Sequence, residues 1–594
     1  MYRPLCVLLL LAFATLGAQA KLQIDAKIIG MRGSSPYNYL RVHITNPSGH
    51  KVGYRFLIRS HFMRELRIPD QEIEPASHKI HHIPVPIGYQ WYQVQAWDSD
   101  KEHYLHHQQN NYKRVYLNIC KIDTWASEKE MQDFSELAIH GEHQPRGTSS
   151  TGGLYGGMPS SGLYGGLPPT TRHRGGGRSA APAKPNYVSQ VEPGTAPDNW
   201  LCYIPFQAVF IDGISYKNLT PTAKDALHTW VDAGGILAVY NTDQKKTQHS
   251  ILGNIHHFEG NPIKEQIFHR DWLDMPPRWQ QLYGGSLSNR EPFPYMVLEM
   301  GGRMETLFLA TLFLIVAGPI NYFYHYKKKK IRRLMLSLPA ISIAFCLLIT
   351  AYFIGTQGFA RKGGSLSLTL LDEATDAGLT LSHHVLFSGL YPLSGFHFDR
   401  QTAFYPLIRP DQTNQFALSL NQKQQLHSGL FIPSKNFHYY TNTPFKTRER
   451  LLYDSAENVV GNGFEHSFQK LAIYHAKSIY EASDIVAGGK AQLKQKEYTE
   501  LSQVKTDTSK PIYLLNCFYD SLSVQEFEYF KRYLLPYIDI MYEHYPDEVF
   551  YLALLEEAPA STQPGLETNP ENQRHLFFGR LEGAAPTATA RLME

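Results

Sequence analysis

Two long apolar stretches, residues 304–324 and 334–353, are separated by a short basic segment. A helix needs about 20 apolar residues to cross a hydrocarbon core of about 30 Å, and each stretch has that length. Six of the eight residues of segment 326–333 are Lys or Arg, and such loops stay cytoplasmic. We therefore predict a hairpin with transmembrane helices at 304–324 and 334–356 and a cytoplasmic loop at 325–333. The chain on either side of the hairpin then lies outside the cytoplasm.

The N-terminus has the pattern of a cleavable secretory signal at residues 1–20. Arg3 precedes an apolar run, and small residues come directly before Lys21, which is the order of zones that a signal peptide shows. Cys6 lies inside the apolar run, so we expect no lipid-anchored cysteine. The hairpin is therefore expected to be the membrane anchor of the mature chain.

Composition and charge limit the classes of function. Without the signal and the hairpin about 520 residues remain, enough for roughly three to four domains. The formal net charge is only +3, and six of the 57 Lys and Arg residues cluster in the hairpin loop, which argues against a nucleic-acid partner. Five cysteines are too few for a disulfide scaffold. Cys120 and Cys202 form a disulfide if their strands are neighbours, or they are buried free thiols.

Residues 21–110 predict an immunoglobulin-like β-sandwich, because short apolar runs alternate there with turn residues. Segments 39–44 and 52–58 are predicted to form a strand pair around a tight turn at 46–49. Segments 80–85 and 91–97 are predicted as a further strand pair. Such a module presents surfaces and rarely performs chemistry.

Residues 111–275 change to an alternation of strands and helices. Segments 207–211 and 236–240 are apolar strand candidates, and residues 221–233 carry apolar side chains at helical spacing after Thr220, a favourable helix cap. This order predicts a doubly wound, Rossmann-like α/β domain.

The same region is interrupted by a long polar segment. Segment 115–119 is a strand candidate and segment 127–140 a helix candidate, and both come before residues 141–197. That last segment is rich in Gly, Pro, Ser and Thr and repeats the sequence Gly-Leu-Tyr-Gly-Gly. It has little apolar surface to bury, so we predict a disordered insertion.

Two stretches resemble a known family. The run FQAVFIDGISYKNLTPTAKDALHTWVDAGGILAVYN resembles the core of the class I glutamine amidotransferase-like superfamily, in a variant found in uncharacterised bacterial membrane proteins. The run AGPINYFYHYKKKK resembles the membrane hairpin of the same proteins. The resemblance implies a two-pass protein of the bacterial plasma (inner) membrane, with both large domains extracytoplasmic or periplasmic.

The chain departs from this family at the expected nucleophile. Active amidotransferases carry a cysteine at the turn after the strand that corresponds to segment 236–240, whereas this turn reads Asn241-Thr242-Asp243. Asn241 supplies no thiolate, and Cys120 and Cys202 lie before the strand. The resemblance therefore implies a pseudo-enzyme without catalytic residues.

One enzymatic alternative stays open, which is an amide or ester hydrolase with a non-cysteine nucleophile. Thr242 or Ser250 is the candidate nucleophile, with His249, His256 or His257 as the base.

Histidines occur in two His-x-x-His-His clusters, His78/His81/His82 and His103/His106/His107. On a strand, residues four apart share a face but lie about 13 Å from each other, too far to bind one metal ion. We therefore predict no metal site. The pairs His256-His257 and His383-His384 are interpreted as ordinary surface residues.

Asp212 and Asp243 follow strands at the edge where open α/β sheets bind ligands. Either they line a vestigial cleft or they serve turn chemistry, and we favour turns. No phosphate-binding glycine loop or dinucleotide fingerprint occurs at a suitable junction, so no cofactor is predicted.

After a connector at 276–303 and the hairpin, residues 364–594 predict a β-rich extracytoplasmic domain. Strands are expected at 365–371, 379–390, 404–408, 416–420, 511–515 and 549–555, with Pro406 confining the third to a sheet edge. Together these features predict a multidomain α+β membrane protein. Its expected role is a non-catalytic scaffold, sensor or accessory subunit of an envelope or transport complex. Its expected partners are the lipid bilayer and a protein or cell-envelope component.

Overall fold

The structure is a computed structural model, and the residues it describes form discontinuous ranges. The predicted signal peptide 1–20, the helix 127–140 and most of the connector 276–303 lie outside them. The described ranges are 22–29, 37–59, 63–86, 91–98, 101–108, 118–122, 187–206, 208–243, 246–249, 253–260, 303–329, 331–357, 361–373, 375–388, 395–406, 416–421, 423–429, 436–476, 478–496, 513–531, 534, 538, 548–555 and 573–581.

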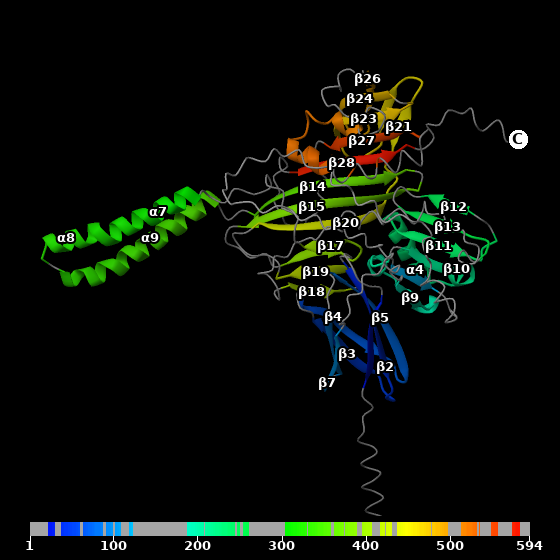
Figure 1. The fold of residues 1–594 in the computed structure, drawn as a ribbon, viewed down its shortest axis with the longest axis horizontal. Coiled ribbons are helices and arrows are strands. Elements are labelled where there is room, and N and C mark those ends of the chain that lie inside the picture. The colour runs from blue at the N-terminus through cyan, green and yellow to red at the C-terminus, as the bar shows by residue number, and fades with distance from the viewer. Residues whose placement is uncertain are drawn as a thin grey trace, which may run out of the picture.

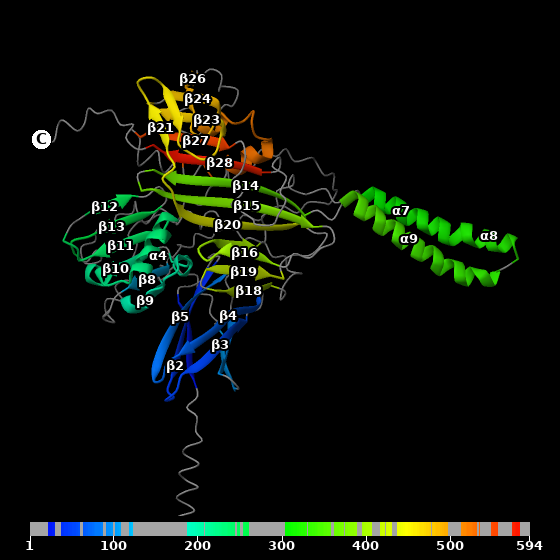
Figure 2. The same cartoon turned by 180° about the vertical axis from the view of Figure 1, so that it is seen from behind.

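Within these residues a β-rich body carries a two-helix hairpin that projects away from it in both views (Figures 1 and 2). At the N-terminal end of the body, a three-stranded sheet in the order β1-β2-β5 and a seven-stranded sheet share one core. The N-terminal strands of these two sheets are β1 (Gln23–Ile29), β2 (Tyr37–Asn46), β3 (Val52–Arg59), β4 (Met63–Ile73), β5 (Ser77–Pro86), β6 (Trp91–Asp98) and β7 (Lys101–Gln108).

The predicted pairing of the first strands is wrong. β2 pairs with β1 and β5, whereas β3 pairs with β4 and β6 in the facing sheet. The predicted pair at 80–85 and 91–97 is also wrong, because β5 pairs with β2 and β6 pairs with β3 and β7. Asn46 ends β2, and its amide group donates to the carbonyls of His50, Ile73 and Glu74 and accepts from Ser48. These bonds hold a turn that carries the chain from one sheet to the other. Both strands thereby bury their apolar faces against each other across the sandwich.

The seven-stranded sheet is completed by strands that follow the hairpin in the sequence. Its order is β16-β19-β18-β4-β3-β6-β7, and β18 runs parallel to β4 with Leu418 opposite Leu66. The sequence treats residues 21–110 and 364–594 as separate domains, and the structure joins them in one sheet. The added strands are β16 (Phe396–Asp399), β18 (Phe416–Leu420) and β19 (Gln424–Ser428).

A six-stranded sheet lies beside this sandwich, in the order β12-β13-β11-β10-β8-β9, with only β12 antiparallel to its neighbour. Its elements are β8 (Asn118–Ile122), β9 (Tyr187–Val191), β10 (Ala208–Asp212), β11 (Ile236–Tyr240), β12 (Lys246–His249) and β13 (Asn254–His257), with α3 (Gly213–Lys217), α4 (Pro221–Asp232), η1 (Pro193–Thr195) and η2 (Trp200–Cys202).

Local sequence signals predicted the central elements of this region correctly. The predicted strands at 207–211 and 236–240 and the helix between them are confirmed, and the Thr220 hydroxyl accepts a hydrogen bond from the Ala223 N–H as the expected cap. The insertion predicted at 141–197 is wrong at its C-terminal end, because β9 lies there and pairs with β8. Val191 of β9 is buried. Pairing with β8 thus produces a strand even in a segment of mostly polar composition.

A nine-stranded sheet forms the centre of the body, in the order β17-β20-β15-β14-β28-β27-β23-β24-β26. Pro406 is the last residue of the edge strand β17, as predicted. The segment 511–515, predicted as a strand, contains helix α10 instead. The elements are β14 (Arg361–Asp372), β15 (Ala377–Ser388), β17 (Ala403–Pro406), β20 (Phe437–Lys446), β23 (Phe468–His475), β24 (Ser478–Ile485), β26 (Lys494–Lys496), β27 (Phe550–Leu555), β28 (Gln573–Arg580) and α10 (Tyr513–Asn516); β21 (Leu451–Asp454), β22 (Val459–Asn462) and β25 (Lys490–Gln492) form a small separate sheet.

One core joins the six-stranded and the nine-stranded sheets. Helix α4 contacts β15 and β20, and its Trp230 and Leu227 belong to the same buried cluster as Leu368 of β14. Figure 2 shows α4 on the side of its sheet that faces these strands. The regions before and after the hairpin therefore pack together along most of the body.

The hairpin consists of α7 (Arg303–Ile315), the π-helical turn η5 (Val316–Ile320), α8 (Asn321–Lys327), the short turn η6 (Ile331–Arg333) and α9 (Leu334–Gln357). Leu307–Lys327 and Ile331–Tyr352 are long and apolar enough to cross a membrane. Their large apolar side chains, among them Phe308 and Leu336, are mostly exposed, which suits a lipid environment.

Asn321 is buried between the helices, and its side-chain oxygen accepts a hydrogen bond of 2.9 Å from the Ser337 hydroxyl. Pro319 lies in the π-helical turn that precedes Asn321, and a proline and a π-helical turn are both common causes of a helix kink. The Asn321–Ser337 bond joins the two helices near the basic loop.

Candidate functional site

The carboxyl ends of β10 and β11 carry Asp212 and Asn241, the positions where a vestigial cleft and the missing nucleophile were expected. Asp212 ends β10, and one carboxylate oxygen accepts from the N–H groups of Ile214 and Ser215 at the start of α3. The other oxygen accepts a bond of 2.8 Å from the side-chain amide of Asn241, which follows β11. Asp212 therefore caps the first turn of α3 and ties it to the loop after β11.

Asn241 has a φ angle of 55°, a left-handed conformation that asparagine tolerates better than most residues. A sharp turn thus forms here without a following glycine, which the sequence did not predict. The turn at Asn241 packs closely against Gly213, where the absence of a side chain leaves room for it. A Cβ atom at Gly213 would lie 2.8 Å from the Asn241 carbonyl oxygen and 3.2 Å from the Thr242 side chain. The two loops close over this edge of the sheet.

Thr242 occupies the position next to the expected nucleophile, but its hydroxyl donates to the Phe258 carbonyl at 3.0 Å. The Thr242 hydroxyl has a single proton, and in this arrangement the Phe258 carbonyl accepts it. The proton is therefore not positioned for transfer to an imidazole. The interpretation of His256 as a surface residue is wrong, because it is buried with its ring stacked on Phe258. The His257 ring packs edge-on against Tyr216. Ser250 and the His249 side chain lie outside the described residues.

Two histidines of the first cluster, His81 and His82, are half-buried beside tyrosines, whereas His78 is exposed. The Tyr54 hydroxyl lies 2.5 Å from His81 Nε2, and the Tyr39 hydroxyl lies 2.6 Å from His82 Nδ1. Burial lowers the pKa of both imidazoles to about 4, so both rings are neutral at pH 7. Among the described residues no group of three metal-ligand side chains is close enough to hold an ion. The side chains of His103, His106 and His107 lie outside that set.

The interpretation of His383 and His384 as surface residues is wrong. Both are buried in β15, where His383 stacks on Tyr440 and His384 on Tyr439. Burial lowers the pKa of both rings, that of His384 to about 3. Two adjacent residues of one strand are buried here because β15 is covered on both faces, which local sequence does not reveal.

Cys120 of β8 and Cys202 of η2 are buried free thiols. Desolvation raises the pKa of both thiols, so neither is a reactive thiolate at neutral pH.

A cavity with a volume of about 780 Å³ lies on the nine-stranded sheet. Much of its polar lining is bonded within the sheet. Thr369 lies 2.8 Å from Thr380 and 2.6 Å from His575, and Ser382 lies 2.8 Å from Ser367. These bonds across neighbouring strands account for the buried hydroxyls without a ligand.

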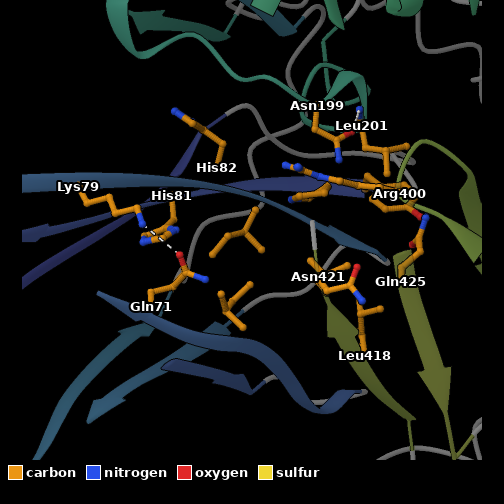
Figure 3. Close-up of a pocket in the computed structure, with 15 residues that line it drawn as sticks. Gln71, Lys79, His81, His82, Asn199, Leu201, Arg400, Leu418, Asn421 and Gln425 are labelled. Carbon is orange, nitrogen blue, oxygen red and sulfur yellow. Dashed lines mark hydrogen bonds between the residues drawn. The ribbon is translucent and has the colours of Figure 1, made fainter. Parts of the chain in front are cut away.

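A smaller cavity of about 280 Å³ lies where three parts of the chain meet (Figure 3). One wall consists of strands β4 and β5, and a second consists of the segment around η2. The third consists of strands β18 and β19 with the loop at Arg400. We call it the junction cavity. It is lined by Tyr37, Ile68, Gln71, Lys79, His81, His82, Ile83, Pro84, Asn199, Leu201, Arg400, Leu418, Leu420, Asn421 and Gln425.

Sequence reasoning singled out only His81 and His82 among these lining residues, as members of a cluster that is not expected to hold a metal ion. Lys79, Asn199 and Arg400 come from segments far apart in the sequence, so no spacing pattern joins them. Trp200 holds the η2 segment in place, because its indole N–H donates to the Gln401 carbonyl at 2.7 Å. No protein-family model and no curated protein matches the sequence.

Proposed function

We propose that the chain is a non-catalytic, membrane-anchored protein of the bacterial envelope that displays binding domains outside the cytoplasm. It acts as a scaffold, a sensor or an accessory subunit of an envelope or transport complex. Its partners are the lipid bilayer and a protein or cell-envelope component. Nucleic acid is not among them, since the net charge of +3 is small for 594 residues.

The pairing of β4 with β18 is the observation that carries the proposal. Backbone hydrogen bonds between these strands require residues 63–73 and 416–420 to lie on the same side of any membrane. A hairpin between them that crosses twice meets this requirement, whereas one crossing does not. The basic residues Lys327–Lys329 and Arg332–Arg333 at its tip favour a cytoplasmic tip. Both large regions then lie outside the cytoplasm.

The non-catalytic part of the proposal is supported by the edge of the six-stranded sheet. We propose that this sheet, with α4, is a degenerate Rossmann-like domain related to the class I amidotransferases, with Asn241 in place of the cysteine. Asp212 is engaged in capping α3 and binding Asn241, and Thr242 donates to a backbone carbonyl. A domain of this kind serves as a binding module or a structural support.

Reporter fusions test the topology. A reporter that is active only outside the cytoplasm is expected to be active when fused after Glu594 and silent when inserted between Lys327 and Arg333. The reverse pattern overturns the proposal. Co-purification of the full chain then separates its variants: a stoichiometric membrane ATPase indicates an accessory subunit, and recovery alone indicates a self-contained sensor or scaffold.

The alternative, an amide or ester hydrolase that uses Thr242, is tested by activity. The purified full chain is assayed with amide and ester substrates beside a Thr242→Val variant, which keeps the shape of the side chain and removes the hydroxyl. We expect no turnover that depends on Thr242. Hydrolysis by the parent chain that is lost in Thr242→Val establishes the enzyme instead.

A further inference from the structure

The walls of the junction cavity carry positive but no negative side chains. Lys79 and Arg400 line it, and none of the described lining residues is Asp or Glu. Asp198 pairs with Arg400 at 3.4 Å but lies outside the lining and is about half exposed. A pair this exposed is weak, so Arg400 keeps much of its attraction for an anion.

The amide side chains present hydrogen-bond donors to the cavity because their oxygens are already engaged. Gln71 Oε1 accepts from the Lys79 ammonium at 3.0 Å, and Asn199 Oδ1 accepts from the Leu201 N–H at 3.0 Å. Asn421 Oδ1 accepts from the N–H groups of Lys423 and Gln424. Ammonium and backbone N–H groups only donate, which fixes the orientation of each amide. The –NH₂ groups remain as the amide atoms available to a ligand.

The remaining walls are apolar or closed. Leu201, Leu418 and Ile83 are buried side chains that line the cavity. Gln425 is fully used, since its amide nitrogen donates to the carbonyls of Asp399 and Thr402 and its oxygen lies 2.9 Å from His427 Nε2. In Figure 3 the side chains of Gln71, Asn199 and Arg400 converge on one space from three directions.

We propose that the junction cavity binds a small molecule through an oxyanion group, a carboxylate or a phosphate. Two cations and several N–H donors without a lining carboxylate match an acceptor-only group, and the apolar walls accommodate a short carbon skeleton. The volume of about 280 Å³ restricts the ligand to a small one. The inference rests on the proposed binding role and makes the protein a sensor, because the ligand contacts three separate parts of the chain at once.

Calorimetric titration of the solubilised full chain with inorganic phosphate and with succinate tests this site. We expect saturable one-to-one binding of at least one of them above a sodium chloride baseline of equal ionic strength. Binding of phosphate alone, or of succinate alone, identifies the class of oxyanion. If neither ion binds saturably, the inference is wrong.

Isosteric amide-to-acid variants locate the binding. Gln71→Glu keeps the oxygen that Lys79 contacts and replaces the –NH₂ donor by a negative oxygen. We expect at least about a tenfold loss of affinity, since a charge-assisted bond is replaced by repulsion. Asn421→Asp keeps the turn bonds to Lys423 and Gln424, and serves as a second variant if Gln71→Glu misfolds. The control Asn218→Asp adds the same charge at an exposed amide after α3, and its affinity is expected to match the parent.

If Gln71→Glu and Asn421→Asp both bind the oxyanion as tightly as the parent chain, the ligand binds elsewhere and the inference is wrong. This result is distinguishable from failure of the proposed function. Turnover that depends on Thr242, or inverted reporters, contradicts the proposed function even when the oxyanion titration succeeds.

Discussion

At the scale of single residues, several side chains have roles that only their contacts explain. Gly235 follows α4, and a Cβ atom there would overlap the Trp230 ring, which is fully buried. Gly234 beside it has a φ angle of 107°, which favours glycine. The two glycines end the helix and leave room for the indole.

The variant Gly235→Ala is expected to destabilise the fold by about 1–3 kcal/mol, because Trp230 has to move within a packed core. The control is Gly49→Ala, where a Cβ atom meets nothing within 4 Å and the expected change stays within about 1 kcal/mol. Chemical unfolding of the solubilised chain, followed by tryptophan fluorescence, measures both. Equal destabilisation by the two variants contradicts the steric explanation.

Asp232 at the end of α4 predicts a dependence of stability on pH. Desolvation raises its pKa from 3.8 to about 6 in the folded chain. The folded state then binds more protons than the unfolded state between these values, so this residue makes stability fall as pH rises toward 6. Asp232→Asn is expected to be more stable than the parent chain above pH 6 and equal to it below about pH 4. Unfolding midpoints measured across this range test the sign, and an equal difference at every pH refutes it.

At the scale of elements, a buried ion pair joins the ends of two parallel neighbours in the nine-stranded sheet. Arg580 of β28 contacts Asp372 of β14 at 2.9 Å, with side-chain exposures of 9% and 0%, and it also reaches Glu548 at 3.1 Å. Arg450 and Asp376 form a contact of 2.7 Å, but their side chains are 40% and 43% exposed. Burial rather than distance distinguishes these two pairs.

Arg580→Met is expected to destabilise the chain by about 3–5 kcal/mol, because it leaves the Asp372 carboxylate buried without its cation. Arg450→Met is the matched control and is expected to change stability by less than about 1 kcal/mol. Denaturant midpoints of both variants give the comparison. Similar midpoints for the two variants would show that the buried pair contributes no more to stability than the exposed pair.

At the scale of the whole molecule, the regions on either side of the hairpin form one body. The pairing of β4 with β18 and the core around α4 each join residues that precede the hairpin to residues that follow it. Tyr37 of β2 also reaches the backbone of Phe404, where its hydroxyl accepts from the N–H at 2.8 Å. The seven-stranded sheet is therefore completed only by strands that follow the two apolar helices in the sequence.

A disulfide trap tests this arrangement. Arg67 lies opposite Ser419 in the parallel register, so Arg67→Cys with Ser419→Cys is expected to crosslink under mild oxidation. After proteolytic cleavage near the hairpin, the two fragments should stay together on a non-reducing gel. Arg67→Cys with Lys490→Cys, a residue of the separate small sheet, is the control and should separate. Separation of both pairs contradicts the shared sheet.

The sequence by itself determined the features that depend on neighbouring residues. The two apolar helices, the strands β10 and β11 and the cap of α4 at Thr220 follow from hydrophobic periodicity and capping, which act within one element. Tertiary structure decided which strands pair across the hairpin, which histidines are buried and where Lys79, Asn199 and Arg400 meet. These features depend on contacts between distant segments, and a strand of given pattern can pair with many partners until the buried faces of the whole molecule select one.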